Sequence, residues 1–454
     1  MVSLIRVLAC LGLLSSCARA ATTPNTIELA LTSNFAKTIG ERYYMNISIG
    51  TPGQVQTMAI DTGSSNTIVL GSNASFCETS VCAGGTLNLS AASTLETIDS
   101  GALQQSYVDH EYFEGDYFGD RVQMNDLAIT NFPMGIANRM ALFFAPYTGI
   151  LGLGYSSHMA WPGTKSKKVA LPPSFVEALV QAGSILFGGV DTAKYRGPLT
   201  TLNVVAEDEK PAGNFYLYLE SVTMRPHGGQ NRTIVRSTKH RRYRTVPDTG
   251  TPSWYLPTSA YRKVIKQAGV TSTDDVPLSS VFEHRKYVRP CRDVAYGTAN
   301  TTRFDITFSG NGTNTGTLNL ELANLFTPLT SEHGSVVTDG DGQPMCWLRV
   351  VESDELMITG SAVMRAGYFV FDLDNGQVSL AQANLGANSS NVVQVEAGTG
   401  LSKAASDVRS ETKKINVEGQ MSATAVYKLS TVTSNIDYGT GAKSHPAATG
   451  AVSQ

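Results

Sequence analysis

The tripeptide Asp-Thr-Gly occurs twice in this chain, each time after a strand-like run. Residues 58–64 read Met-Ala-Ile-Asp-Thr-Gly-Ser, and residues 245–251 read Thr-Val-Pro-Asp-Thr-Gly-Thr. Two carboxylates that face each other at close range cannot both ionise, so such a pair shares one proton. One member can then act as a base while the other acts as an acid. If the fold brings them face to face, Asp61 and Asp248 could form such an acid–base pair.

A single Asp-Thr-Gly would carry little information, because these residue types also make ordinary turns. Here each copy has a second partner further along the chain: residues 149–152 read Gly-Ile-Leu-Gly, and residues 357–360 read Met-Ile-Thr-Gly. The units of a repeat array would recur more often than this. The paired motifs therefore predict two similar lobes that contribute one carboxylate each.

The elements that must position these carboxylates are mainly strands. Short runs of β-branched and aromatic residues, separated by Gly, Asn, Asp and Pro, extend from about residue 40 to 385. Residues 43–49, 57–60 and 303–308 are examples, and this pattern is typical of strands. Helical patterns occur at residues 173–182 and 258–268. We therefore expect a mostly β protein.

Composition limits the function further. The 454 residues are 42% hydrophobic, enough for two or more units with sizeable cores, and the net charge of −3 offers no basic excess for nucleic acid. Gly-x-Ser-x-Gly, His-Glu-x-x-His and Gly-Lys-Thr motifs do not occur in the sequence. We expect polypeptide substrates, no nucleic acid, no cofactor, no metal and a monomer.

The N-terminus resembles a secretory signal. Residues 1–20 contain an apolar run at residues 7–14, followed by Ala-Arg-Ala at residues 18–20. This run is too short to span a bilayer, so we expect no stable membrane insertion. Cleavage would remove Arg6 and Arg19 and change the formal charge from −3 to −5. Glycosylation sequons also fit a secreted protein, and they lie at Asn46, Asn73, Asn88, Asn231, Asn300, Asn311 and Asn388.

The C-terminal part has a different composition. After residue 383 the chain is rich in Ala, Ser, Thr, Gly, Val and Asn and poor in aromatic residues. Such a segment buries too little apolar surface to offset its ordering entropy. We therefore expect residues 386–454 to be a disordered tail, and residues 21–40 to be a short N-terminal segment.

Four cysteines follow the signal peptide: Cys77, Cys82, Cys291 and Cys346. An even number in an oxidising compartment predicts two disulfides. The spacing contains no Cys-x-x-Cys pair, so a zinc site is not favoured.

Further stretches resemble the pepsin-like aspartic proteases, most closely the secreted fungal ones. Residues 49–54 (Ile-Gly-Thr-Pro-Gly-Gln) and 61–66 (Asp-Thr-Gly-Ser-Ser-Asn) are similar to the opening of that family. Residues 184–191 (Ser-Ile-Leu-Phe-Gly-Gly-Val-Asp) are similar to the end of its first lobe. Residues 368–372 (Tyr-Phe-Val-Phe-Asp) resemble its closing strand. The resemblance covers about residues 40–385.

The resemblance implies a bilobal pepsin-like acid protease fold with the active cleft between two lobes, at residues 41–196 and 197–385. It implies a secreted aspartic endopeptidase that hydrolyses extended polypeptides at acid pH. A water held between Asp61 and Asp248 would attack the peptide bond without a covalent intermediate. The resemblance also assigns support of the catalytic loops to Thr62, Gly63, Ser64, Thr249, Gly250 and Thr251.

Three further features follow only from the resemblance. Tyr107 corresponds to the tyrosine on a hairpin flap that covers the substrate. The implied disulfides join Cys77 to Cys82 and Cys291 to Cys346.

The sequence also departs from the family. Ile68 stands where a Trp commonly supports the flap tyrosine, and Pro247, which has no backbone donor, precedes Asp248. Residues 181–184 lack the extra strand and turn of the sheet that joins the lobes, so we expect an unpaired edge and poor folding. Residues 235–243 are a candidate replacement strand. Too few residues precede the first strand for the usual inhibitory pro-segment.

Two alternatives remain open. A non-catalytic secreted peptide-binding relative would keep the cleft but lose competent geometry at Asp248. A structural wall protein would be retained in the cell wall by its tail. The basic residues at 239–244 fit a processing site or a patch for an acidic partner, although a solvated loop is favoured.

Overall fold

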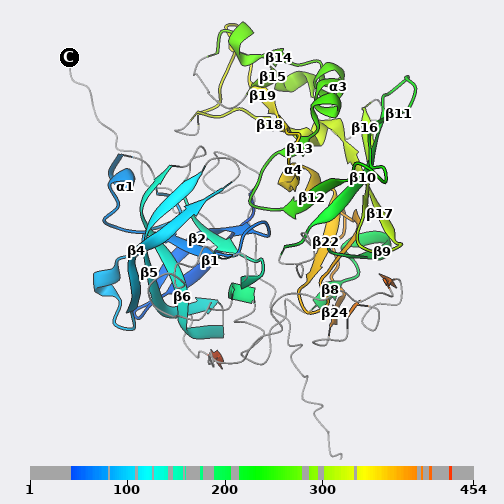
Figure 1. The fold of residues 1–454 in the computed structure, drawn as a ribbon. Coiled ribbons are helices and arrows are strands. Elements are labelled where there is room, and N and C mark those ends of the chain that lie inside the picture. Colours follow the sequence, from blue (N-terminus) through cyan, green and yellow to red (C-terminus); the bar gives the residue numbers. More distant parts are fainter. Residues whose placement is uncertain are drawn as a thin grey trace, which may run out of the picture.

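The computed structural model describes residues 42–79, 82–107, 111–124, 127–141, 147–156, 159, 174–176, 189–205, 214–278, 286–294, 301–331, 335–395, 400–401, 408–411 and 429–431. Within these residues the strands form two large sheets and three smaller ones (Figure 1). The expectation of a mostly β protein is confirmed.

The first large sheet contains the first Asp-Thr-Gly and has the strand order β26-β6-β3-β7-β2-β1-β5-β4. Met45, Ile47 and Ile49 alternate along β1 and pack in the core of this lobe, and Tyr44 and Ser48 on the other face are buried as well. The bounds are β1 (Tyr44–Ile49), β2 (Gln54–Asp61), β3 (Thr67–Leu70), β4 (Glu96–Ser106), β5 (Tyr112–Met124), β6 (Leu127–Ala141), β7 (Gly149–Gly152) and β26 (Leu429–Thr431).

The second large sheet contains the second Asp-Thr-Gly and has the order β17-β16-β10-β12-β21-β13-β20, with β11 paired to β10. Leu217 and Leu219 alternate along β10 and pack in the core of this lobe with Trp254 and Phe304. The bounds are β10 (Leu217–Arg225), β11 (Arg232–Arg236), β12 (Tyr243–Asp248), β13 (Trp254–Leu256), β16 (Arg303–Ser309), β17 (Thr315–Glu321), β20 (Val350–Glu352) and β21 (Met357–Gly360).

A smaller sheet at the top of Figure 1 extends the second lobe. It consists of β14 (Thr271–Ser272), β15 (Tyr287–Pro290), β18 (Phe326–Pro328) and β19 (Met345–Leu348). The helix predicted at residues 258–268 is confirmed as α3 (Thr258–Ala268), which ends at Gly269 in a left-handed conformation with φ 58°. The other described helices are α1 (Ser75–Thr79), α4 (Ser361–Met364), η2 (Leu89–Ala91), η4 (Thr273–Asp275), η5 (Cys291–Asp293) and η6 (Leu322–Leu325).

The two motif pairs found in the sequence occupy equivalent positions in the two large sheets. Strand β2 runs parallel to β7 with Asp61 opposite Gly152, and β12 runs parallel to β21 with Asp248 opposite Gly360. In each sheet a third strand, β3 or β13, pairs antiparallel with the Gly-containing strand. Each Asp-Thr-Gly therefore begins where a buried strand ends, beside a parallel partner.

A third region of sheet lies between the lobes. One sheet has the order β22-β23-β9-β25, and a two-stranded sheet pairs β24 with β8. The lobe boundary expected between residues 196 and 197 falls inside β9. The bounds are β8 (Gly189–Asp191), β9 (Tyr195–Asn203), β22 (Gly367–Asp372), β23 (Gln377–Ala383), β24 (Val392–Gln394) and β25 (Val408–Arg409).

The expectation that residues 386–454 are disordered is wrong for the described part of that segment. Strands β24, β25 and β26 pair with β8, β9 and β6 respectively. Composition predicted disorder because the segment has little apolar surface of its own. It could not reveal that sheet edges elsewhere in the fold provide backbone partners for these residues.

The suspected gap at residues 181–184 lies outside the described residues, as does most of the predicted helix at 173–182, of which 174–176 are described. The suggested replacement strand is not at the interlobe sheet. Strand β11 (Arg232–Arg236) pairs with β10 in the second lobe, and at the β8 edge the paired strand is β24.

Candidate active site

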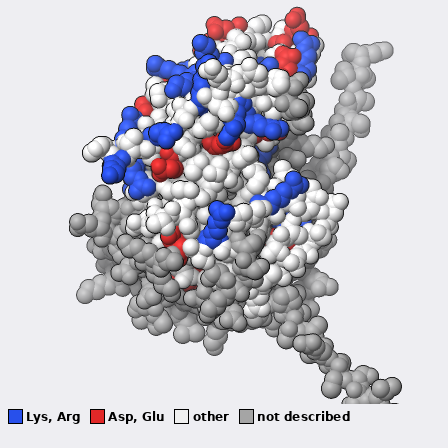
Figure 2. Space-filling model, turned by 90° about the vertical axis from the view of Figure 1, so that its right-hand side faces the viewer, with Lys and Arg blue, Asp and Glu red and all other residues white. Residues whose placement is uncertain are grey.

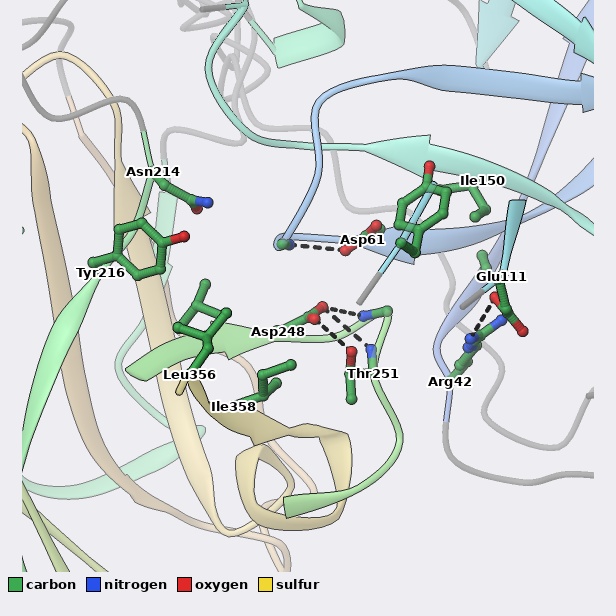
Figure 3. A pocket seen from close by; sticks show the side chains of 15 residues that line it. Arg42, Asp61, Glu111, Ile150, Asn214, Tyr216, Asp248, Thr251, Leu356 and Ile358 are labelled. Atoms are coloured by element: carbon green, nitrogen blue, oxygen red, sulfur yellow. Dashed lines mark hydrogen bonds and ion pairs between the residues drawn. The ribbon is translucent and has the colours of Figure 1, made fainter. Parts of the chain in front are cut away.

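The two Asp-Thr-Gly loops bring Asp61 and Asp248 together in the lining of one pocket (Figure 3). The carboxyl group of each residue lies against the glycine of the opposite loop. Both residues are buried, with 5% of Asp61 and 8% of Asp248 exposed. Residues that are 187 positions apart in the sequence therefore form one site.

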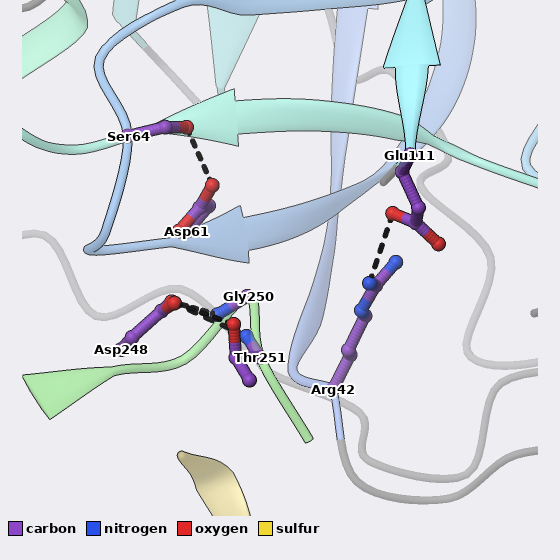
Figure 4. A network of polar contacts seen from close by, with 7 residues as sticks. All are labelled: Arg42, Asp61, Ser64, Glu111, Asp248, Gly250 and Thr251. Atoms are coloured by element: carbon purple, nitrogen blue, oxygen red, sulfur yellow. Dashed lines mark hydrogen bonds and ion pairs between the residues drawn. The ribbon is translucent and has the colours of Figure 1, made fainter. Parts of the chain in front are cut away.

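Each carboxylate is held by matching donors (Figure 4). Asp61 accepts a hydrogen bond at Oδ1 from the Gly63 N–H at 2.8 Å and at Oδ2 from the Ser64 hydroxyl at 2.5 Å. Asp248 accepts from the Gly250 N–H at 2.8 Å and from the Thr251 hydroxyl at 2.6 Å. The structure thus places the predicted loop-support residues around the carboxylates, and their donors fix both carboxyl planes.

The glycines of the two motifs allow the carboxyl groups to approach. A Cβ added at Gly63 would lie 2.5 Å from the Asp248 carboxyl carbon, and one added at Gly250 would lie 2.5 Å from Oδ1 of Asp61. Real Cβ atoms essentially never show contacts this short. Each loop therefore needs glycine because the carboxylate of the other loop occupies that space.

The two threonines of the motifs lock the loops to each other. The Thr62 hydroxyl donates to the Pro247 carbonyl at 2.8 Å, and the Thr249 hydroxyl donates to the Ile60 carbonyl at 2.7 Å. Each hydroxyl also accepts a hydrogen bond from the backbone N–H of the other threonine, at 3.1 Å in both cases. Four reciprocal hydrogen bonds thus join the lobes directly beneath the carboxylates.

Pro247 does not interrupt its strand. It lies opposite Thr359 in the parallel ladder of β12 and β21, and its carbonyl is the acceptor for Thr62. Ile68, at the other departure from the family, is fully buried in an apolar cluster against which Tyr107 packs. The cluster supports the tyrosine ring by contact, because an isoleucine side chain has no donor to offer.

The site shifts the protonation of one carboxyl group. Burial, and then the neighbouring Asp61 carboxylate, raise the pKa of Asp248 to about 8, although hydrogen bonds from Thr251 and Gly250 act in the opposite direction. Asp248 therefore keeps its proton in acid and neutral solution. This is the state that a proton-sharing pair requires.

Tyr107 lies at the end of the β4–β5 hairpin and lines the pocket. Its N–H donates to the Glu111 carbonyl at 2.8 Å, and its ring packs edge-on against Phe113 with 5.9 Å between centroids. Burial and the nearby Asp61 raise the pKa of Tyr107 well above its usual range, so the hydroxyl stays protonated. The hairpin turn at residues 108–110 lies outside the described residues.

Sequence reasoning missed an ion pair at the edge of the pocket. Arg42 and Glu111 both line it, and their charged groups are 3.1 Å apart with only 12% and 2% of the side chains exposed. Figure 4 shows the pair beside the two Asp-Thr-Gly loops. The two residues are 69 positions apart and belong to no motif, so the sequence carries no signal that they meet.

The pocket has a volume of about 100 Å³ and is lined by both lobes. On the side of the second lobe, Asn214 and Tyr216 precede β10, and Leu356 and Ile358 belong to the β21 segment (Figure 3). Ile150 of β7 contributes from the first lobe. Apolar walls around two carboxyl groups suit a ligand whose side chains are buried while its backbone reaches polar groups.

Both disulfides join the cysteines that the resemblance implied, Cys77 with Cys82 and Cys291 with Cys346. Each bridge links residues of a single lobe. Within the described residues, no helix is long and apolar enough to cross a membrane. In the same part of the chain, no cluster of three His, Cys, Asp or Glu side chains could hold a metal ion.

The basic residues at 239–244 occupy the turn from β11 to β12 and the start of β12. The guanidinium of Arg242 lies 3.4 Å from the centre of the Tyr218 ring, and that of Arg244 lies 4.9 Å from the centre of the Tyr216 ring. Figure 2 shows Lys and Arg side chains gathered over this side of the molecule. The arginines are ordered against tyrosines, and Lys239 and His240 are exposed to solvent.

Comparison with known proteins decides the family. The sequence profile described as eukaryotic aspartyl protease matches residues 42–383. This chain belongs to the eukaryotic aspartyl proteases. The match includes the two Asp-Thr-Gly loops and strands β1 to β23, so the resemblance noted in the sequence is confirmed.

Several fungal aspartyl proteases are similar along most of their length. The probable aspartic-type endopeptidase OPSB of Arthroderma benhamiae is 27% identical, covering 79% of this chain and 71% of the relative. The aspartic proteinase yapsin-3 of Saccharomyces cerevisiae is 28% identical, covering 77% and 68%. Barrierpepsin of the same yeast is 26% identical, covering 89% and 69%. This aspartyl protease is therefore a proteolytic hydrolase, as expected.

Proposed function

We propose that this aspartyl protease is a secreted endopeptidase that hydrolyses extended polypeptides at acid pH, with Asp61 and Asp248 as its catalytic pair. The observation that carries the proposal is the reciprocal packing of the two loops. Gly63 and Gly250 leave room for the carboxyl group of the opposite loop, so each loop is shaped around the other carboxylate. Such an arrangement has a direct use in acid–base catalysis.

In the proposed reaction, the ionised Asp61 takes a proton from a water held between the two carboxyl groups. The oxygen of that water attacks the scissile carbonyl carbon, while the protonated Asp248 donates a hydrogen bond and then its proton to the carbonyl oxygen. The raised pKa of Asp248 supports its role as the acid. The tetrahedral diol then collapses and the C–N bond breaks: Asp61 gives its proton to the leaving amine, while Asp248 takes back a proton from a diol hydroxyl. Both carboxyl groups thereby return to their starting states, and no bond to the enzyme forms.

The proposed substrate is an extended peptide, because the pocket is lined by both lobes and by Tyr107 at the end of the β4–β5 hairpin. An extended backbone can bond to such a hairpin while alternate side chains enter apolar pockets. Leu356, Ile358 and Ile150 line the pocket and would contact an apolar side chain.

Secretion is supported by the signal-like N-terminus and by the two disulfides, which form and persist in oxidising compartments. The first 41 residues lie outside the described part, so the evidence for the signal is the sequence itself.

The test compares purified wild-type protein with Asp61→Asn and Asp248→Asn on denatured casein at acid pH. We expect the wild type to cleave casein and both variants to lose activity by at least about 1,000-fold while keeping a cooperative thermal transition. Asp275→Asn serves as a matched control, because Asp275 is exposed and distant from the pocket lining, and it should keep full activity.

Two outcomes would count against the proposal. Substantial proteolysis by either pocket variant would refute the catalytic pair. A folded wild type that binds peptides but cleaves none at any pH would instead favour the non-catalytic peptide-binding alternative.

A further inference from the structure

The chain does not leave the fold after the last strand of the second lobe. Residues 387–395, 400–401 and 408–411 lie against strands β8 and β9 and the β16–β17 turn, and we call these described residues the C-terminal strap. Strand β24 pairs antiparallel with β8, and β25 pairs parallel with β9. Figure 1 shows β24 next to β8, below β22. The strap therefore occupies backbone edges that would otherwise be open.

The first anchor of the strap is Asp191 at the end of β8. Its carboxylate accepts hydrogen bonds from the Asn391 N–H at 2.8 Å and from the Ser390 hydroxyl at 2.7 Å. The neighbouring Thr192 completes the contact: its N–H donates to the Asn391 carbonyl at 3.0 Å, and its hydroxyl accepts from the Asn391 amide at 2.6 Å. Both the backbone and the side chain of Asn391 are thus bound.

An apolar residue holds the middle of the strap. Leu401 is 4% exposed and packs in a cluster with Val190 of β8, Leu199 of β9 and Ala381 of β23. Burying a leucine in this way is favourable because it removes apolar surface from water. The strap is therefore packed as well as hydrogen-bonded.

The second anchor is Glu411, whose carboxylate lies on the turn between β16 and β17. It accepts hydrogen bonds from the N–H groups of Thr313 at 3.1 Å and Asn314 at 3.0 Å, and from the Thr313 hydroxyl at 3.3 Å. Consecutive N–H groups on a turn form a concave anion site. A Cβ added at Gly312 would overlap the Glu411 carboxyl group, so the turn is shaped for this ligand. Asn314 also donates to the Arg409 carbonyl at 3.2 Å.

We propose that the edges of β8 and β9, together with the β16–β17 turn, form a second peptide-binding site, separate from the catalytic pocket, and that the strap is its built-in ligand. The ligand class is an extended peptide that carries an Asn near its start and a carboxylate at its end. In the described part of the chain, the strap supplies strand partners for β8 and for one edge of β9. The proposal does not rest on the catalytic role of Asp61 or Asp248.

The site also has consequences for the two lobes. Residues 189–203 connect the first lobe to the second, and the β16–β17 turn belongs to the second lobe. Beyond the strap, β26 pairs with β6 of the first large sheet. Binding of the strap therefore restrains the connection between the lobes from outside the cleft.

The first experiment uses full-length protein with Glu411→Gln, which keeps the size of the side chain but removes its charge. We expect the Tm to fall by about 2–4 °C, which corresponds to roughly 1 kcal/mol in a domain of 150–250 residues. Hydrogen exchange should quicken at residues 313–314 and 408–411 and stay slow in the Asp-Thr-Gly loops. Glu355→Gln is the matched control, because Glu355 is exposed and should leave both measurements unchanged.

A double-mutant cycle separates the anchor from a general effect of each substitution. Gly312→Ala should lower the Tm in the wild type, because its methyl group displaces the Glu411 carboxylate. In a Glu411→Ala background the same change should cost much less, since the overlapping group is gone. Equal costs in the two backgrounds would overturn the assignment of the turn as the Glu411 site.

The binding claim itself is tested in trans. A synthetic peptide of residues 387–411, added to the Glu411→Ala protein, should raise its Tm with increasing concentration, because a ligand of the folded state stabilises it. A peptide of the same composition in scrambled order is the control. If the two peptides act alike, or if residues 392–394 exchange freely in the wild type, there is no second peptide-binding site.

Discussion

At the scale of single residues, the site depends on two positions at which glycine has no side chain. Gly63 and Gly250 each face the carboxyl group of the opposite lobe at a distance that would not admit a Cβ. Conformational freedom is a secondary matter here, because neither residue has a positive φ. The glycine of an Asp-Thr-Gly motif is therefore best understood as space for its partner's aspartate.

This interpretation predicts the effect of Gly63→Ala. The added methyl group should push the Asp248 carboxyl away and lower proteolytic activity by about 100-fold, the loss typical of a displacement of about 1 Å at a catalytic group. Gly386→Ala is the control, since no atom lies within 4 Å of its added Cβ. Casein hydrolysis and thermal unfolding would be measured for both. A fully active Gly63→Ala enzyme would contradict the packing argument.

The raised pKa of Asp248 predicts how stability depends on pH. In the folded protein this pKa is about 8, against about 3.9 in an unfolded chain, so the folded state holds the proton more tightly. The stabilising contribution is complete below about pH 4 and is lost as pH rises through about 8. The free energy of unfolding should therefore fall across this window in the wild type.

Asp248→Asn cannot titrate, so its stability should lack that fall. The measurement is the Tm at steps from pH 4 to pH 8, with Asp275→Asn as a control that retains the wild-type slope. Parallel curves for the wild type and Asp248→Asn would show that the proton is not held at this residue. Proteolysis by the wild type should decline later, only as the pH approaches about 8, where the folded protein loses the shared proton.

At the scale of elements, the parallel pairs β2–β7 and β12–β21 present the two loops, and the threonines tie them together. Thr62→Val removes a donor to the Pro247 carbonyl and an acceptor for the Thr249 N–H. Each buried group left without a partner costs about 1–3 kcal/mol. We therefore expect a loss of about 2–6 kcal/mol in the free energy of unfolding, measured in urea.

The control for this prediction is Thr223→Val, which alters an exposed pair of threonine hydroxyls on neighbouring strands. That change should alter the free energy of unfolding by less than about 0.5 kcal/mol, as surface substitutions usually do. If Thr62→Val were equally mild, the crosswise hydrogen bonds would not be what joins the loops.

In the sheets that contain β8 and β9, strands that are far apart in the sequence pair with one another. The expectation of poor folding rested on a missing strand near residues 181–184. In the structure, strands of the C-terminal strap pair with β8 and β9. Poor folding stays a prediction to be measured. It was expected because of unpaired strand edges, and the edges of β8 and β9 described here have partners.

At the scale of the whole molecule, charge and processing can be predicted together. The secreted chain should begin at Ala21, carry a formal charge of −5 and sediment as a monomer. Expression in a fungal host, followed by N-terminal sequencing and sedimentation of the protein in the medium, checks this. Leu11→Arg, which interrupts the apolar run, should keep the protein inside the cell. Equal secretion of both forms would refute the signal peptide.

Short stretches of sequence were sufficient to identify the candidate site residues and the strands that carry them. Asp61 and Asp248, their threonines and glycines, and the alternation of apolar residues along the strands are properties of short stretches. Short stretches report local geometry well, because side chains alternate along a strand and loops need particular residues. The sequence also carries the family resemblance, and the resemblance implies the pairing of the four cysteines.

Features that depend on contacts between distant residues became apparent only in the tertiary structure. The Arg42–Glu111 ion pair joins residues without a shared motif, and the raised pKa of Asp248 arises from burial and from a carboxylate of the other lobe. The strap was misjudged because its order comes from its partners: Asp191 and the turn at Thr313 supply hydrogen bonds that its own composition cannot reveal. Composition measures what a segment can bury by itself, whereas a sheet edge binds almost any backbone that reaches it.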